Sequence, residues 1–302
     1  MEKILGYENS NQFKTKRVKI SRDKSGIILR TLEPEISFQQ MKKYRAEVSA
    51  GFIYNDLRTG HVFANLGVSG ILTINIEGND YLITVKQDRV DFRDCVAKLV
   101  SGYLDSKDLK NPDAALKKEI SEEVLPITSD KNLIRFIHQK KNIGNPFSEH
   151  FQNYSAPIQL DYPAKFNIKD LETAVISIDG LPLREPAGLY FHASFNSAQL
   201  VFSYHLNHQD LDFNKLGISL HHSEDKLKKN RGIIEKIFHP LGILLIKIEN
   251  KELTDKVYSL FDGTLIAVNP KAVNLSEVFA EKNHSIVEAK NISLGDYLKQ
   301  EN

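Results

Sequence analysis

The chain has 302 residues, enough for one large domain or two ordinary ones, with a sizeable hydrophobic core in either case. Hydrophobic residues make up 41% and charged residues 26%, which excludes the disordered and fibrous classes. Forty basic and 39 acidic residues give a formal net charge of +1, so no global field favours nucleic acid or an anionic membrane, and neither is expected as a partner.

The expected compartment follows from signals that the sequence lacks. Cys95 is the single cysteine, which excludes an intrachain disulfide framework and a cysteine-rich zinc site. Residues 1–16 carry no apolar segment of a secretory signal, and the longest apolar run, residues 241–246, is far shorter than the roughly 20 residues of a membrane span. We therefore expect a cytoplasmic protein without a membrane partner.

The clearest local signal is a β-hairpin. Two β-branched runs, residues 71–76 and 81–87, are separated by the turn-forming residues 77–80. After a loop, residues 96–100 are apolar enough for a short strand that leads into Gly102. The sequence thus predicts two paired strands and a third strand that ends at a glycine.

A helix follows this glycine at a short distance. Asn111 is a good N-cap residue, and Pro112 suits the first helical position, where the missing N–H costs nothing. Pro126 requires that the helix has already ended. These signals predict a helix over residues 112–124.

The downstream half mixes strand and helix signals. Runs rich in β-branched and aromatic residues predict strands at 174–178, 189–195, 199–206, 242–248 and 263–268. Other runs predict helices at 131–139, 224–238 and 275–280. The expected fold class is therefore α/β, in the mixed α+β sense.

The helix over residues 112–124 carries an acidic face. Glu119, Glu122 and Glu123 stand at i, i+3 and i+4, which places their carboxylates in an arc of roughly 100°. Like charges at this spacing repel, so the cluster needs either solvation or a cation, and Mg²⁺ or Mn²⁺ prefers carboxylate oxygens. A solvated acidic face without a ligand is the alternative interpretation of the same pattern.

The segment from the hairpin to the end of this helix resembles a Nudix box. In that resemblance Gly102 is the leading glycine and Lys118 takes the position of the box arginine. Glu119, Glu122 and Glu123 take the positions of the glutamates that bind metal and carry catalysis in the family. The resemblance implies a site with Mg²⁺ or Mn²⁺ as its cofactor.

Other candidate residues bind substrate in the resemblance. Arg89 ends a strand similar to the Gln-x-Arg strand end of ADP-ribose and nucleoside-diphosphate-sugar pyrophosphatases, where an arginine can pair with phosphate. Gly102 and Lys118 complete the expected substrate-binding set.

The sequence departs from the family pattern at three places. Lys118 replaces arginine, Leu125 stands where the closing glycine belongs, and the loop is about two residues longer and lacks its glutamate. Asp108 is a candidate to replace that glutamate. In the related pyrophosphatases a glutamate also precedes the glycine, whereas this chain has Lys98 in that stretch.

The resemblance also implies an architecture. It predicts a Nudix-like mixed sheet sandwiched between helices, over residues 61–302, with inserted elements between about 140 and 260. Residues 1–60 would form an N-terminal extension or subdomain, and residues 286–298 look like the last strand and helix of the domain.

The implied function is divalent-metal-dependent hydrolysis of the pyrophosphate in a nucleoside diphosphate derivative. The glutamates would hold the ion, and one of them, or a carboxylate further along the chain, would act as general base. Such a chain could also form a homodimer. The departures above motivate an alternative, a catalytically inactive domain that binds a nucleotide or a protein partner, and an unrelated protein with an acidic helix also stays open.

Histidine pairs form the remaining candidate sites. His221 with His222, and His205 with His208, match no established metal motif, and we expect them on the surface or in loops. No dinucleotide-binding, P-loop or serine-hydrolase motif occurs in the sequence.

Overall fold

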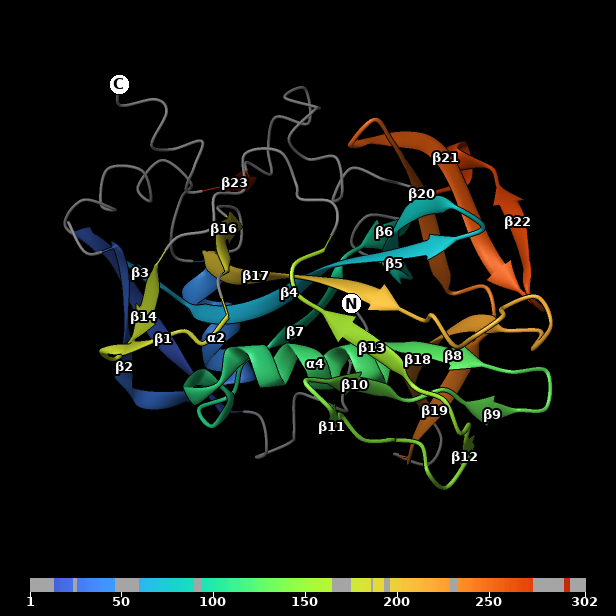
Figure 1. Cartoon of the computed structure of the whole chain (residues 1–302). Coiled ribbons are helices and arrows are strands. Elements are labelled where there is room, and N and C mark those ends of the chain that lie inside the picture. Colours follow the sequence, from blue (N-terminus) through green and yellow to red (C-terminus); the bar gives the residue numbers. More distant parts are fainter. Residues whose placement is uncertain are drawn as a thin grey trace.

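The structure, a computed structural model, describes residues 14–23, 26–46, 60–89, 94–164, 175–185, 187–192, 196–228, 233–273 and 291–293. Over these residues strands predominate, and the α-helices are α2 (Phe38–Ala46) and α4 (Pro112–Glu123), with the 3₁₀ turns η1 (Asp108–Lys110) and η3 (Pro270–Ala272). The predicted α/β class, with a sheet sandwiched between helices, is therefore wrong: the described part of the chain consists mostly of β-sheet in three sheets (Figure 1).

A five-stranded sheet contains the N-terminal strands. Its order is β15-β14-β2-β1-β3, and its strands are β1 (Lys14–Asp23), β2 (Gly26–Ser37), β3 (His61–Phe63), β14 (Ile176–Ile178) and β15 (Leu181–Pro182). β1 and β2 form an antiparallel hairpin, while β14 pairs in parallel with β2. Residues near 180 thus complete a sheet that the first 60 residues begin.

The largest sheet has 13 strands and the central order β11-β10-β13-β17-β4-β5-β20-β21-β22. Its strands are β4 (Asn65–Ile76), β5 (Asn79–Arg89), β6 (Asp94–Lys98), β7 (Val100–Tyr103), β10 (Phe136–His138), β11 (Lys141–Asn142), β13 (Ile158–Asp161), β16 (Gly188–His192), β17 (Ser197–Asn207), β20 (Ile243–Glu249), β21 (Glu252–Phe261), β22 (Thr264–Val268) and β23 (Asn291–Ser293). The strands predicted at 71–76, 81–87, 199–206, 242–248 and 263–268 are confirmed as parts of this sheet.

The third sheet has the order β12-β9-β8-β18-β19. Its strands are β8 (Val124–Ile127), β9 (Asn132–Leu133), β12 (Gln152–Asn153), β18 (Ser219–Lys228) and β19 (Ile233–His239). β8 follows α4 directly and pairs with β18 in antiparallel fashion.

Two segments predicted as helices are strands. Residues 131–139 contain β9 and β10, and the described residues of 224–238 lie in β18 and β19. The second segment is rich in Glu and Lys, which favour helices, but β18 and β19 pair in antiparallel register from His222 opposite His239 to Lys228 opposite Ile233. Pairing with a neighbouring strand, which no local pattern reveals, overrode helix propensity here. The third predicted helix, residues 275–280, lies outside the described residues.

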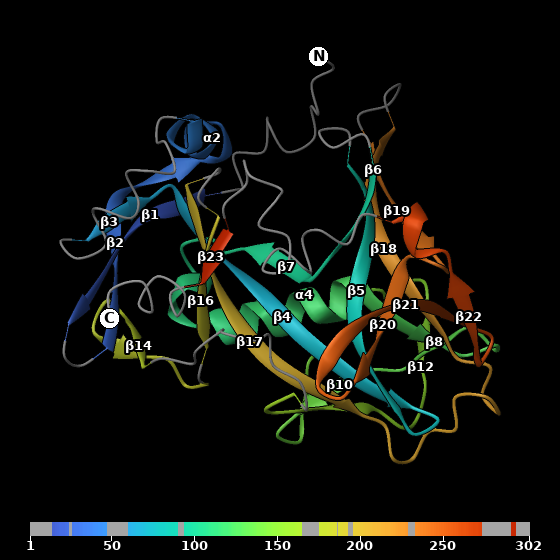
Figure 2. The same ribbon diagram turned by 90° about the horizontal axis from the view of Figure 1, so that it is seen from above.

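The predicted hairpin is confirmed, and its strands diverge away from the turn. Glu77 and Gly78 have φ values of 52° and 77°, as a tight two-residue hairpin turn requires. Close to the turn β4 pairs with β5, but farther along β4 pairs with β7 and β5 pairs with β6. Figure 2 shows this fork between β4 and β5, with β7 and α4 lying in it.

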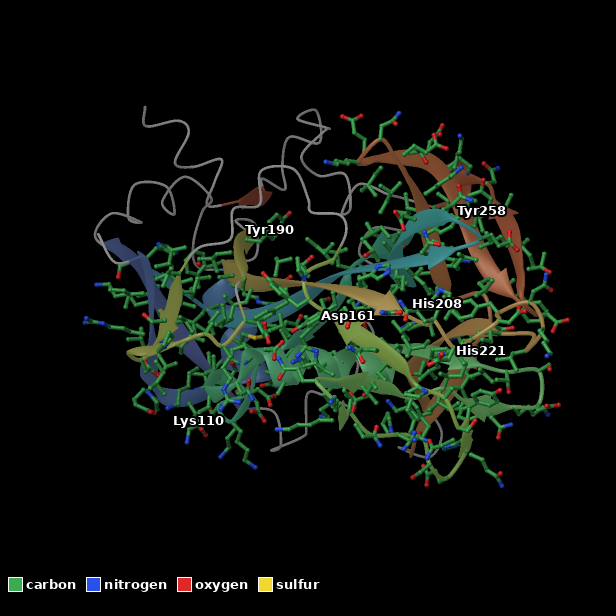
Figure 3. All side chains as sticks on the ribbon, viewed as in Figure 1. Lys110, Asp161, Tyr190, His208, His221 and Tyr258 are labelled. Atoms are coloured by element: carbon green, nitrogen blue, oxygen red, sulfur yellow. The ribbon has the colours of Figure 1, made fainter. Side chains whose placement is uncertain are left out.

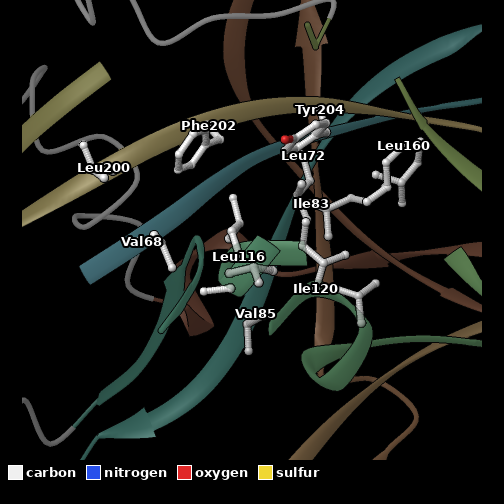
Figure 4. Packing of buried hydrophobic residues seen from close by; sticks show 14 of the residues in the cluster. Val68, Leu72, Ile83, Val85, Leu116, Ile120, Leu160, Leu200, Phe202 and Tyr204 are labelled. Carbon is white, nitrogen blue, oxygen red and sulfur yellow. The ribbon is translucent and has the colours of Figure 1, made fainter. Parts of the chain in front are cut away.

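Helix α4 is the central packing element. The predicted span of 112–124 agrees with the observed span to one residue, although the Asn111 side chain makes no capping hydrogen bond. Leu116 and Ile120 are completely buried, and Figure 4 shows them packed beneath strands β4 and β17, which contribute Leu72 and Phe202. Among the described residues, no helix has the length and apolar character that a bilayer crossing requires.

Candidate functional site at the α4–β7 contact

The first turn of α4 is fixed to β17 by a buried carboxylate. Asp113 is only 7% exposed, accepts a hydrogen bond from the Tyr204 hydroxyl and forms an ion pair with Lys117. Burial, together with the charge of Asp113, raises the pKa of Tyr204 far above its ordinary value, so this hydroxyl remains a donor. This contact and the buried side chains of Leu116 and Ile120 together fix the rotation of α4 about its axis.

This rotation brings Glu119 against the backbone of β7 at Gly102. A Cβ atom on Gly102 would lie 2.4 Å from the carboxyl carbon of Glu119 and 2.4 Å from one carboxylate oxygen. Any side chain at this position would displace the carboxylate, because real Cβ contacts do not reach such distances. The leading glycine of the box-like segment therefore has a physical role: it makes room for Glu119.

Glu123 reaches the same strand one residue earlier. Its Oε2 lies 3.4 Å from the backbone N of Ser101, which donates to it, and its Oε1 lies 3.5 Å from the Lys98 Nζ. Both partners of this ion pair are largely buried, with side-chain exposures of 18% for Lys98 and 17% for Glu123. Two carboxylates from α4 thus converge on consecutive residues of β7.

Glu122 lies on the outer side of this pair. Its side chain is 29% exposed and forms an i,i+4 ion pair with Lys118, at 3.7 Å between Nζ and Oε1. Lys118 is 70% exposed. The predicted glutamates therefore share one helix face, but the structure draws only Glu119 and Glu123 against β7.

The electrostatics of the site disfavour two charged carboxylates. Burial, followed by repulsion from Glu123 and Glu122, raises the pKa of Glu119 to about 7. Burial also raises the pKa of Glu123, although Lys98 and the Ser101 N–H act in the opposite direction. One lysine thus only partly compensates the negative charge, and a bound cation would relieve the remainder.

A histidine that we expected at the surface belongs to the same region. His222 lies in β18, is 5% exposed and stacks with His239 at 6.3 Å between ring centroids. Burial, Lys98 and His239 lower its pKa to about 3, so this ring is neutral. Its neighbour His221, labelled in Figure 3, also lies in β18, so the surface-loop expectation is wrong for both residues.

Two further predicted residues, Arg89 and Asp108, lie on elements other than α4 and β7. Arg89 ends β5, but its side chain lies outside the described residues. Asp108 is part of η1, where burial and the neighbouring Asp105 raise its pKa, and the cation near it is Lys118. Sequence reasoning did not assign Lys98 to the site; its place at the end of β6, two residues before the start of β7, was the available signal.

Glu119 and Glu123 could together hold a divalent cation that needs only one or two protein ligands. Among the residues that the structure describes, no three His, Cys, Asp or Glu side chains form a metal-binding group. Mg²⁺, however, is usually held by one or two carboxylates together with water and substrate phosphates. Glu119 and Glu123 are the two carboxylates of this site that could hold such an ion.

Comparison with known proteins assigns no family to the chain. No protein-family model matches it, and no curated protein matches it. The geometry of the site therefore carries the functional argument.

Proposed function

We propose that this chain is a divalent-metal-dependent hydrolase that cleaves the pyrophosphate of a nucleoside diphosphate derivative. The observation that carries the proposal is the meeting of Glu119 and Glu123 at Ser101 and Gly102, where burial raises the pKa of both carboxyl groups and repulsion from Glu123 and Glu122 raises that of Glu119 further. Perturbed acidic groups of this kind are commoner at functional sites than elsewhere in a protein.

In this proposal Glu119 and Glu123 hold the metal. A Mg²⁺ or Mn²⁺ ion held by these two carboxylates would supply the positive charge that stabilises the leaving phosphate. Lys98 acts against the effect of burial and favours the charged form of Glu123, since its ammonium lies 3.5 Å from that carboxylate. Gly102 keeps the place of Glu119 open.

Glu122 is the carboxylate that remains for proton transfer. It is more exposed than Glu123, at 29% against 17%, so water can reach it more easily. We assign to it the proton that the attacking water loses as its oxygen bonds to phosphorus and the anhydride P–O bond breaks. Lys118 beside it provides a positive charge that favours binding of phosphate.

The alternative is a binding domain without catalysis. Lys98 and Lys118 already pair with Glu123 and Glu122, so part of the acidic face is internally neutralised. Such a domain would still bind a nucleotide but would not turn it over.

Turnover separates the two functions. Release of nucleoside monophosphate from a panel of nucleoside diphosphate derivatives is measured with Mg²⁺ or Mn²⁺ for the wild type and for Glu119→Gln, Glu122→Gln and Glu123→Gln. We expect metal-dependent turnover that falls at least about 100-fold in each variant. The exposed Glu252→Gln, on β21, is the control and should retain wild-type activity. Absence of turnover across the panel would reject hydrolysis and favour the binding domain.

A further inference from the structure

A cluster of aromatic and cationic side chains surrounds the end of β7. The Arg45 guanidinium lies 5.1 Å from the centre of the Tyr103 ring, and the Lys42 ammonium lies 4.9 Å from that of Phe38. The rings of Phe38 and Tyr103 meet edge to face at 6.2 Å. We call these four residues the α2–β7 patch, because three come from α2 and one from β7.

The patch offers both an aromatic surface and positive charge. Tyr103 is 45% exposed, one of the most exposed large apolar side chains in the described part of the chain. Arg45 is held by two donations to the Asn65 side chain, at 2.8 and 3.1 Å, and a third N–H donates to the Tyr103 hydroxyl at 3.4 Å. A guanidinium has five donors, so an anion can bind Arg45 while these contacts persist.

The composition of α2 favours an anionic ligand. The helix carries Lys42, Lys43 and Arg45 and has no acidic residue within Phe38–Ala46. A flat aromatic ring beside fixed positive charge is the combination that binds a nucleobase and its phosphate, because any base can stack on the ring.

The patch lies on the same strand as the carboxylate pair. Tyr103 follows Gly102, and it is two residues from Ser101, about 6–7 Å along a strand. No other described strand pairs with β7 besides β4, and Ser101 donates its N–H to Glu123 from the edge away from β4. Side chains alternate along a strand, so Tyr103 lies on the opposite face of β7 from the Gly102 position that faces Glu119, and a ligand that reaches both Glu123 and Tyr103 would pass around this edge.

We propose that the α2–β7 patch is the nucleoside subsite, in which Tyr103 stacks on the base and Arg45 binds an adjacent phosphate. This inference rests on the proposed function, because it assigns the base-bearing part of the same substrate. It commits the site to a nucleotide and not to inorganic or sugar phosphates alone.

The test is calorimetric binding of ADP, GDP, CDP and UDP, and separately of pyrophosphate, in the presence of Mg²⁺. We expect Tyr103→Ala to weaken all four nucleotides by at least about fivefold, the lower end of base stacking, and pyrophosphate by less than about twofold. Tyr103→Phe should bind nucleotides within about twofold of the wild type. Arg45→Gln should weaken nucleotides and pyrophosphate together, while Glu252→Gln, the exposed control on β21, should change neither by more than about twofold.

Several results would overturn the subsite. These are equal losses for nucleotides and pyrophosphate in Tyr103→Ala, a loss in Tyr103→Phe as large as in Tyr103→Ala, or no nucleotide binding to the wild type at millimolar concentration. Tighter binding of a single-stranded oligonucleotide than of any nucleotide would assign the patch to nucleic acid instead. Nucleotide binding that depends on Tyr103, without turnover, would support the subsite and reject hydrolysis. Turnover together with unchanged nucleotide binding in Tyr103→Ala would support hydrolysis and reject the subsite.

Discussion

At the scale of one residue, ionisation of the Glu119 carboxylate lowers the stability of the folded chain. Its pKa in the folded chain is about 7, against an ordinary value of 4.5, because burial and Glu123 disfavour the charged form. The folded state therefore binds its proton more tightly than the unfolded state does, and folding stability falls as the pH rises from about 4.5 to about 7.

The first prediction follows from that sign. Without metal, Glu119→Gln should stabilise the protein at pH 8 by about 1–3 kcal/mol, and this gain should vanish near about pH 3, where Glu119 is protonated in both states. Urea unfolding at the two pH values measures the difference, with Glu252→Gln as the exposed control. If Glu119→Gln is less stable than the wild type at pH 8, the ionised Glu119 carboxylate does not destabilise the fold, and the prediction is wrong.

The second prediction concerns the space that Gly102 provides. Gly102→Ala should displace the Glu119 carboxylate and lower turnover and metal affinity at least about tenfold, but the stability should change by less than about 1 kcal/mol, because a flexible side chain can move aside. Gly70→Ala is the comparison: its Cβ would lie 3.2 Å from Leu72 and 3.4 Å from Leu116, both in the core. We expect this second variant to lose about 1–3 kcal/mol of stability, and equal effects of the two on metal affinity would refute the assignment.

At the scale of elements, α4 and the hairpin before it could be predicted from sequence because their signals are local. Pro112 and Pro126 limit the helix, and turn residues join β4 to β5. The hydrogen bond from Tyr204 to Asp113 spans 91 residues and could not be predicted, since no spacing in the sequence links the two.

The third prediction tests that long-range contact. Tyr204→Phe removes the hydroxyl from a buried carboxylate and should cost about 1–3 kcal/mol of stability. Tyr154→Phe is the matched control, since among the described residues its hydroxyl has no hydrogen-bond partner, and it should cost less than about 0.5 kcal/mol. Thermal unfolding followed by circular dichroism measures both, and equal losses would show that the hydroxyl does not hold α4.

At the scale of the whole molecule, sequence patterns failed because pairing between distant strands decides the architecture. β17 lies parallel to β4, some 130 residues away, and β14 joins the N-terminal sheet. The Glu- and Lys-rich segment around residues 224–238, which was predicted to be helical, contributes the paired strands β18 and β19. The predicted boundary near residue 60 stays a prediction, as does the insertion between about 140 and 260.

The fourth prediction is that the N-terminal sheet and α4 unfold together. Leu29 of β2 and Leu116 of α4 are completely buried and belong to one continuous hydrophobic cluster. Leu29→Ala and Leu116→Ala should each cost about 2–5 kcal/mol and shift one shared transition. A separate early transition in Leu29→Ala alone would mean that residues 14–46 unfold as an independent subdomain.

The central claim is that Glu119 and Glu123 together hold a divalent cation, and Mn²⁺ binding followed by electron paramagnetic resonance tests it directly. We predict one Mn²⁺ site in the wild type at pH 8, lost in Glu119→Gln and in Glu123→Gln but retained within about threefold in Glu122→Gln, which should fail only in turnover. Equal Mn²⁺ affinity in the wild type and in the Glu119→Gln and Glu123→Gln variants, or no binding by the wild type, would contradict the site.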